Sequence, residues 1–411
     1  MKLETDTMTA KERFETLISH KEPDRIPMYI MGIPVYSRVH KELLKYHEID
    51  FDEFTDNDEN LMITDIGDFT THYYFGAEIE MESIGVRNDY KAQLVVPIKD
   101  GFELDKSGHT PEQRARDLKK GEVYYTVDYI GCVRGHVLLE DGDPYTWYVD
   151  GFLKTKEAVL DWYNTYGWPQ EKPVNRANVD AYNSAVKKFS DRIAFVPQIG
   201  GMQLYESTWV IMGQSRWGYY CRKDPDFIKM LINSRKDAQL KILDELLKLN
   251  PVAVFGGDDM GQKGRSMVGP ANFRKFFFEP YKEIFDKIHE AGAIAFNHCC
   301  GNIVDLLPDY IEAGLNGWQA LEVQSMIDHA ELKKKYGDKL LLVGGIDASD
   351  IMCFGSPEDV RMHVKQQIKA MGKGGGYILG PTHDYLNVSY DNAIAMRDAC
   401  YEFGKYPLSN L

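Results

Sequence analysis

The sequence predicts a (β/α)8 barrel, and the order of its apolar segments is the main reason. In the second half of the chain, short apolar runs without period-2 alternation take turns with helical segments. That order is typical of parallel strands joined by right-handed crossovers. Seven such strands can be recognised, and an eighth in the less legible region 60–100 would close a barrel. No Gly-rich phosphate loop follows the first strand, which argues against the alternative, an open doubly wound sheet.

The expected strands are short and rich in Val, Ile, Leu and Phe, as strands buried on both faces are. They occupy 24–33, 192–198, 251–257, 293–298, 317–321, 340–346 and 376–381. Helices are expected between them. Examples are 273–292 and 389–404, where the pattern closes on a glycine suited to a C-terminal cap.

The region from about 85 to 150 has a different pattern. Segments such as "EVYYTVDYIGCVRGHVLLE" and "PYTWYVDGF" alternate with period 2 and are separated by turn residues, which predicts antiparallel strands. No linker or internal repeat divides the chain. We therefore expect residues 1–411 to form a single domain, with a β-rich insertion at about 85–150.

Composition excludes several classes of protein. A net charge of −15 argues against a nucleic-acid partner. No apolar stretch approaches the roughly 18 residues that cross a bilayer, and the polar start of the chain has no signal-peptide core. Six cysteines in 411 residues do not make a disulfide framework. We expect a cytoplasmic protein without a membrane partner, and both a monomer and a homo-oligomer stay open.

Polar side chains collect after five successive expected strands, and in a parallel barrel the catalytic groups lie at those strand ends. A His two residues before a Cys along an extended chain projects to the same side, which predicts a zinc site at His298 and Cys300 while Cys299 points away. Packing is the alternative for such cysteines. The residues at the five strand ends are Asp258, Asp259, His298, Cys299, Cys300, Gln319, Glu322, Asp347, His383 and Asp384.

Aromatic side chains supply a candidate pocket for a ring. Tyr205 and Trp209 lie at helical spacing after the strand at 192–198, and the chain has 25 Tyr and 19 Phe. Core packing is the alternative, and it is the preferred interpretation for Met212 in the same segment.

Longer stretches carry a resemblance to a known family. The segments "TAKERFETLISHKEPDRIPMYI" (9–30), "HCCGNIVDLLPDYIEAG" (298–314) and "GSPEDVRMHVKQQIKAMGKGGGYILGPTH" (355–383) resemble the uroporphyrinogen decarboxylase superfamily, in particular its corrinoid-linked methyltransferase branch. The resemblance implies a (β/α)8 barrel. In that branch it also implies a zinc site in which His, a skipped residue and Cys precede Gly-Asn, as in "HCCGN" here.

One departure from the family pattern bears on the reaction. In members that methylate a thiol, the resemblance implies a second Cys at the last strand end, and this chain has His383 in roughly that place. Exchanging a thiolate for neutral imidazole would leave a zinc ion more electron-poor and a better Lewis acid toward an oxygen leaving group. The exchange favours cleavage of an ether.

We therefore expect an O-demethylase that moves a methyl group from a methoxylated aromatic, an aryl methyl ether, to the Co(I) of a corrinoid. Because the chain has no Asp-x-His-x-x-Gly motif, the corrinoid is expected on a partner protein. Asp258 or Asp259 is expected to protonate or orient the leaving oxygen. Zinc is expected on His298, Cys300 and His383, and the expected substrate contacts are Tyr205, Trp209, Gln319 and Glu322.

Other functions stay open. One is a methylcobalamin:thiol methyltransferase of the same branch, whose further Cys ligand is missing here. Another is uroporphyrinogen decarboxylase itself, which is disfavoured because the segment after the first strand supplies only Arg38 where that family is Arg-rich. A metal-free barrel that only binds a corrinoid protein is the non-enzymatic alternative.

Overall fold

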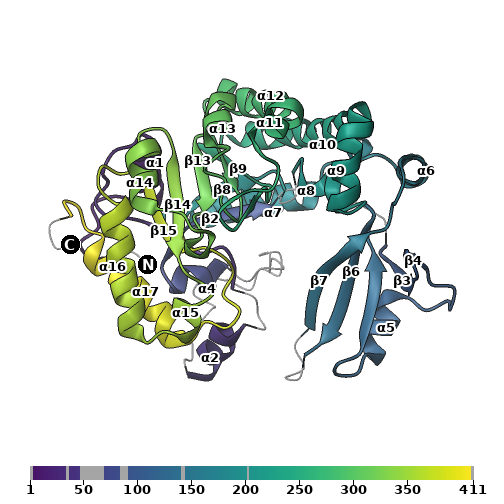
Figure 1. The fold of residues 1–411 in the computed structure, drawn as a ribbon. Coiled ribbons are helices and arrows are strands. Elements are labelled where there is room, and N and C mark those ends of the chain that lie inside the picture. The colour runs from purple at the N-terminus through teal and green to yellow at the C-terminus, as the bar shows by residue number, and fades with distance from the viewer. Residues whose placement is uncertain are drawn as a thin grey trace. The chain divides into compact units, whose positions relative to one another are not determined.

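The computed structural model describes residues 3–33, 37–46, 69–83, 91–139, 144–200 and 203–408. The chain divides into two compact units (Figure 1). The first comprises Met1–Gly85, Asn175–Gly201 and Leu243–Leu411. The second comprises Val86–Val174 and Met202–Ile242.

The first unit contains a closed barrel of parallel strands, which confirms the predicted fold class. The strand order around the barrel is β1-β15-β14-β13-β12-β9-β8-β2. The eighth strand that the sequence left unplaced is β2, inside the region 60–100. The strands are β1 (Met28–Tyr29), β2 (Ala77–Ser83), β8 (Ala194–Gln198), β9 (Ala253–Gly257), β12 (Ile294–His298), β13 (Gly317–Ala320), β14 (Leu341–Ile346) and β15 (Tyr377–Pro381).

Alternate residues of these strands fill the barrel interior, because successive side chains of a strand point to opposite faces. Each large apolar side chain buried there stabilises the fold by about 1.5–3 kcal/mol. At Gly380 the backbones come too close for a side chain, since an added Cβ would lie 2.2 Å from the carbonyl oxygen of Tyr29. The interior cluster includes Tyr29, Ile79, Val196, Phe255, Phe296, Leu341, Val343 and Ile378.

Helices follow the strands in the first unit, and several begin with side-chain caps. Thr9 and Glu12 form a capping box at the first helix, and Ser356 and Asp359 form one at α16. The helices are α1 (Ala10–Ile18), α2 (Arg38–Tyr46), α4 (Phe69–Tyr74), α7 (Arg176–Phe189), α12 (Phe278–Glu290), α13 (Leu307–Ala313), α14 (His329–Tyr336), α15 (Ile351–Phe354), α16 (Pro357–Met371) and α17 (Tyr390–Phe403).

The helix expected over 273–292 contains a π-helical turn near its start. It opens with α11 (Pro270–Asn272), passes through a π-helical turn at Phe273–Phe277 and continues as α12. A π turn adds one residue, so residues eight apart come onto one helix face. Accordingly, the rings of Phe273 and Tyr281 stack with centroids 6.1 Å apart, and both are fully buried.

The second unit contains a five-stranded antiparallel sheet in the order β4-β3-β5-β6-β7. Its register sets Gly135 opposite Trp147, whose indole lies against the glycine where a Cβ would not fit. The strands are β3 (Gln93–Ile98), β4 (Gly101–Leu104), β5 (Val123–Val127), β6 (Cys132–Leu138) and β7 (Pro144–Gly151). The helices are α5 (Pro111–Asp117), α6 (Lys156–Tyr166), α8 (Glu206–Trp209), α9 (Gln214–Lys223) and most of α10 (Pro225–Leu246). None of the described helices combines the length and the apolar character needed to cross a membrane.

Buried ion pairs tie the start of the chain to β2. Arg13 donates to Asp24 at 2.7 Å and to Glu78 at 2.8 Å, while Arg25 donates to Asp6 at 2.8 Å and also pairs with Glu78. Burial would raise the pKa of Asp24, but the hydrogen bonds and charge of Arg13 hold it below the ordinary value of 3.8. The same network therefore makes stability depend on pH.

We expect Asp24→Asn to lower the free energy of unfolding by about 3 kcal/mol near pH 7, because Arg13 loses a buried partner. A carboxyl group with a depressed pKa stabilises the fold above its unfolded pKa and loses that effect as pH falls. The deficit should therefore shrink below about pH 4. Urea unfolding at several pH values measures it. Asp286→Asn, which removes an exposed pair with Lys282, is the control, and a deficit of equal size at every pH would contradict the expectation.

Candidate metal centre

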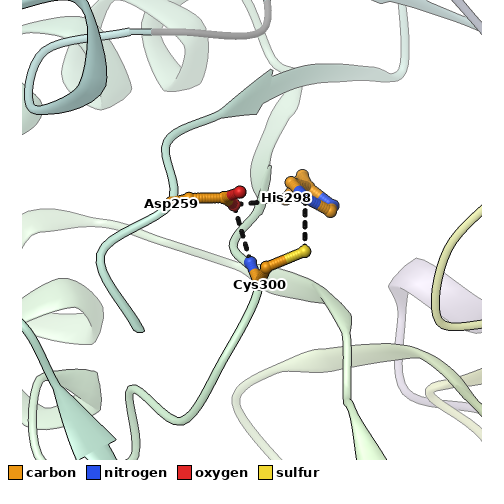
Figure 2. A group of neighbouring side chains, drawn as sticks. All are labelled: Asp259, His298 and Cys300. Carbon is orange, nitrogen blue, oxygen red and sulfur yellow. Dashed lines mark hydrogen bonds and ion pairs between the residues drawn. The ribbon is translucent and has the colours of Figure 1, made fainter. Parts of the chain in front are cut away.

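Three side chains with metal-ligating atoms meet where β9 and β12 end. The ligand atoms of Asp259, His298 and Cys300 all lie within 4.8 Å of one another. Nε2 of His298 lies 3.2 Å from Oδ1 of Asp259 and 3.2 Å from Sγ of Cys300. The backbone N–H of Cys300 donates to Oδ1 of Asp259 at 2.8 Å (Figure 2). The arrangement offers one nitrogen, one sulfur and one oxygen to a single point.

Strand phase brings these residues together. Phe296 points into the barrel interior, so His298, two residues later, faces the same way. His298 is paired with Gly257 of β9, and Asp259 follows that glycine by two residues. Cys299 is turned away, and its buried Sγ accepts the backbone N–H of Met260 at 3.2 Å. Of the adjacent cysteines, only Cys300 joins the cluster.

Gln319 orients the imidazole of His298. The register of β12 and β13 sets Gln319 beside His298, and Nδ1 of His298 is hydrogen-bonded to Oε1 of Gln319. Because an amide oxygen only accepts, the Nδ1 atom carries a hydrogen, and Nε2 is the ring nitrogen that faces Asp259 and Cys300. The side chain of Gln319 is fully buried. The structure thus places it behind His298.

Glu322 holds the loop that follows Cys300. Its Oε2 accepts the backbone N–H of Gly301 at 2.9 Å and the hydroxyl of Ser325 at 2.5 Å. Gly301 has a φ of +78°, and an added Cβ would lie 2.3 Å from the carbonyl carbon of Gly261. Only glycine fits this crossing of two loops.

Asp258 faces away from the cluster. Its side chain is buried, and Oδ2 accepts the hydroxyl of Tyr281 at 2.5 Å. Burial, and next the charge of Asp258, raise the pKa of Tyr281 well above its ordinary value. The backbone N–H of Asp258 donates to the carbonyl of His298 at 3.0 Å. The two adjacent carboxylates therefore have different surroundings: the carboxylate of Asp259 contacts His298 and Cys300, whereas that of Asp258 contacts Tyr281.

His383 lies outside the three-residue cluster. Its side chain is 51% exposed, and Nδ1 accepts the backbone N–H of Asp384 at 2.8 Å. Asp347, at the preceding strand end, accepts from Gln324 at 3.0 Å and from the backbone of Ser349. These side chains belong to the same rim of the barrel but stabilise their own loops.

The charges of the cluster are interdependent. Burial would lower the pKa of His298, but the neighbouring Cys300 and Asp259 hold it well above its ordinary value. Burial would raise the pKa of Asp259, yet the hydrogen bond and charge of His298 hold it below its ordinary value. Burial raises the pKa of the Cys300 thiol, and His298 opposes that effect. The site therefore favours a positive charge between a carboxylate and a thiol, which suits a divalent metal ion.

Known proteins resemble the part of the chain that carries this cluster. The family model for uroporphyrinogen decarboxylase (URO-D) matches residues 200–403. The chain belongs to the uroporphyrinogen decarboxylase superfamily. Barrel strands β9 to β15, and with them every residue of the cluster, lie inside the match.

Curated relatives of the superfamily carry different activities in their names. Over 223 residues the chain is 23% identical to uroporphyrinogen decarboxylase of Psychromonas ingrahamii, which covers 50% of this chain and 59% of that protein. Over 214 residues it is 23% identical to methylcobamide:CoM methyltransferase MtaA of Methanosarcina barkeri, and this match covers 51% of this chain and 59% of that protein. The matches span about three fifths of the first of these relatives. A solved methyltransferase from Methanosarcina mazei shares the fold, with a TM-score of 0.61, 15% identity, and coverage of 96% of this chain and 99% of that one.

Tyr205 and Trp209 belong to the second unit. Tyr205 is buried, with its ring centroid 6.2 Å from that of Trp209 and 5.2 Å from that of Trp217. Trp209 also packs edge-on against Tyr148 at 5.0 Å. Within this unit they form an aromatic cluster, and their contact with a substrate stays a prediction.

Two residues of the site have roles that sequence reasoning missed. Asp259 is one, because we expected it to assist the leaving oxygen and not to be a metal ligand. The rule that selected Cys300 applies to it as well: residues 255, 257 and 259 alternate along the chain as 296, 298 and 300 do, so their side chains point to the same side. Tyr281 is the other. Its position depends on the π turn before α12, which no pattern in the sequence indicates.

We expect the purified chain to bind about one zinc ion through Asp259, His298 and Cys300, with a position left open as in catalytic zinc sites. Cys300→Ser should lose the metal, while Cys299→Ser should keep it because Cys299 faces Met260. Elemental analysis after dialysis measures the zinc content, and circular dichroism checks folding. Equal losses in the two variants would show that the phase argument is wrong.

Gln319→Leu should weaken zinc binding by about 10- to 100-fold, because the imidazole loses the acceptor that fixes its orientation. Gln319→Glu keeps an acceptor and should retain most of the affinity. Competition with a chelator of known affinity measures both. Asn392→Leu removes another buried amide, one that donates to Met352 and Gly355, and should leave zinc binding unchanged. If Asn392→Leu weakened zinc binding as much as Gln319→Leu does, Gln319 would contribute only to the stability of the fold.

Proposed function

We propose that this chain is a zinc-dependent methyltransferase that moves a methyl group from an aryl methyl ether to the Co(I) of a corrinoid carried by a partner protein. The donor set of the cluster carries the proposal: Asp259, His298 and Cys300 offer a carboxylate, an imidazole and a single thiol. Membership of a superfamily with a methylcobamide methyltransferase among the relatives supports methyl transfer. The choice of an ether as the methyl donor rests on the chemistry of the ligands.

The ligand set fits a catalytic zinc ion. Three protein ligands of mixed type, with one position left for substrate, are typical of such sites. When bound, zinc would act as a Lewis acid toward the ether oxygen. A carboxylate is a harder ligand than a thiolate and transfers less electron density. A site with Asp259 in place of a second thiolate therefore suits an oxygen leaving group better than a thiolate nucleophile.

The chain's own residues would orient the reaction. Co(I) of the partner would attack the methyl carbon in line, the carbon–oxygen bond would break, and its electron pair would stay on the phenolate oxygen. The conjugate acid of that phenolate has a pKa of about 10, so its charge needs support. Gln319 would keep Nε2 of His298 directed at the cluster, and Glu322 would hold Gly301 and the loop after Cys300 in place.

The two carboxylates would have separate roles. Asp259, whose pKa lies below its ordinary value through its contacts with His298, is an anion at neutral pH and would serve as a ligand instead of a proton donor. Asp258, buried behind the hydroxyl of Tyr281, would support the loop. Protonation of the phenolate would then come from solvent, or from His383, which is exposed at the same rim.

Methyl transfer between a corrinoid and a thiol is the second candidate. The likeness to a methylcobamide:CoM methyltransferase favours it, whereas the single cysteine of the cluster argues against it. Uroporphyrinogen decarboxylation is disfavoured, because Arg38, the arginine after the first strand, is paired with Glu42 at 2.7 Å and cannot by itself supply an Arg-rich site for several carboxylates.

Methyl transfer from a panel of methoxybenzoates to free cob(I)alamin is the test. We expect the absorbance of cob(I)alamin to give way to that of methylcobalamin with the zinc-loaded chain, and the rate to fall at least about 100-fold in Cys300→Ser, which lacks a metal ligand. A parallel assay offers methylcobalamin and simple thiols. Thiol methylation without transfer from any methoxyarene would replace the proposal by the second candidate.

A further inference from the structure

The rim of the barrel presents an apolar side chain in a strained backbone conformation. Met326 has a φ of +61°, in the left-handed region, and its side chain is 69% exposed. A left-handed conformation costs a non-glycine residue roughly 1–2 kcal/mol. Strain of this kind persists where the surrounding structure imposes it, and such sites are often functional. The loop thus holds a thioether out in solvent at an energetic cost.

A small hairpin beside Met326 carries free positive charge. Its strands are β10 (Gly261–Gln262) and β11 (Arg265–Ser266), and Lys263 lies at its tip. Lys263 and Arg265 are exposed, and within the described ranges neither is paired with a carboxylate. The chain has 63 acidic and 48 basic residues, so two unpaired cations on one hairpin differ from the general character of the molecule.

Hydrogen bonds join the hairpin and the Met326 loop to the loop that carries Cys300. The side chain of Asn302 donates to the carbonyls of Ser325 at 3.1 Å and Met326 at 3.4 Å. The backbone of Asn302 donates to Gln262 at 2.9 Å, and that of Gly264 donates to Ser325 at 3.2 Å. These contacts join 261–266, 300–302 and 322–326 into one hydrogen-bonded unit, called the rim platform below.

The rim platform also adjoins the candidate metal centre. Cys300 belongs to it, and Glu322 fixes it through Gly301. A methyl group added at Gly264 would lie 3.8 Å from Sδ of Met326, so the exposed thioether lies next to the charged hairpin. Whatever docks on Lys263, Arg265 and Met326 would therefore lie over the rim that holds the cluster.

We infer that the rim platform is the docking surface for the corrinoid-carrying partner, and that the partner presents an acidic surface with an apolar depression at its centre. The inference rests on the proposed function and names the partner's surface chemistry. Two unpaired cations would steer an acidic protein to the rim. One flexible thioether would fill an apolar depression and could be released after each transfer, as a transient complex requires.

Charge reversal at the hairpin tests the inference. The double variant Lys263→Glu, Arg265→Glu is compared with the unaltered chain in methyl transfer to free cob(I)alamin and to cob(I)alamin held by purified corrinoid proteins. We expect kcat/KM for the protein-bound acceptor to fall by about tenfold or more at low salt, and its salt dependence to flatten. Transfer to free cob(I)alamin should keep its rate, because neither residue touches the cluster.

Two further variants sharpen the comparison. Met326→Ser should slow transfer to the protein-bound acceptor and leave its salt dependence intact. Lys339→Glu reverses an exposed lysine two residues before β14, at the opposite end of the barrel, and should change neither assay. An effect of Lys339→Glu equal to that of the double variant would mean that only net charge matters, and would overturn the inference.

The remaining outcomes separate this inference from the proposed function. If the unaltered chain transfers no methyl group to free cob(I)alamin, the proposed function fails. If it does, and the double variant serves the protein-bound acceptor as well as the unaltered chain, the docking inference fails alone. An equal loss with both acceptors would assign Lys263 and Arg265 to the corrinoid itself, which also overturns a protein surface as the occupant.

Discussion

The hydrogen bond between Nδ1 of His298 and the amide oxygen of Gln319 is the interaction on which the candidate site depends. It keeps a hydrogen on Nδ1 of the imidazole and so directs Nε2 at Asp259 and Cys300. The bond in turn depends on the register of β12 and β13, which sets the two side chains side by side in the barrel interior. A slip of one residue in either strand would turn its own side chain toward the surrounding helices and separate the two.

The candidate site also depends on the close approach of two backbone segments, at Gly261 and Gly301. Gly301 and Gly261 let two loops cross where a side chain would collide. Leu321, fully buried with a φ of +42°, directs the chain so that Glu322 reaches the N–H of Gly301. A bulky residue in the left-handed region is unfavourable, so the packing around β13 has to compensate for it. The site thus combines regular strands with a few irregular loop residues.

Most of the fold could be predicted from the sequence because buried parallel strands leave an unbroken apolar pattern. The first strand is shorter than its apolar pattern predicts. The apolar run at 24–33 contributes only Met28–Tyr29 to the ladder, and Pro27 within it has no N–H to donate. At the site, His298 and Cys300 follow from period-2 phase. The position of Asp259 follows from the same rule applied to β9, whereas the Tyr281 contact and the strain at Leu321 depend on tertiary packing that no local pattern encodes.

The shortness of β1 has a consequence for how the barrel moves. Its two residues make few ladder contacts with β2 and β15, and the register shifts between them. Closure there relies on the charged network of Arg13, Arg25 and Glu78, so local opening should begin at this seam before it reaches the well-paired strands. In the strand order, β12 and β13 lie across the barrel from β1 and β2. Opening at this seam would widen the barrel on the side away from β12 and β13, the strands that carry His298 and Gln319.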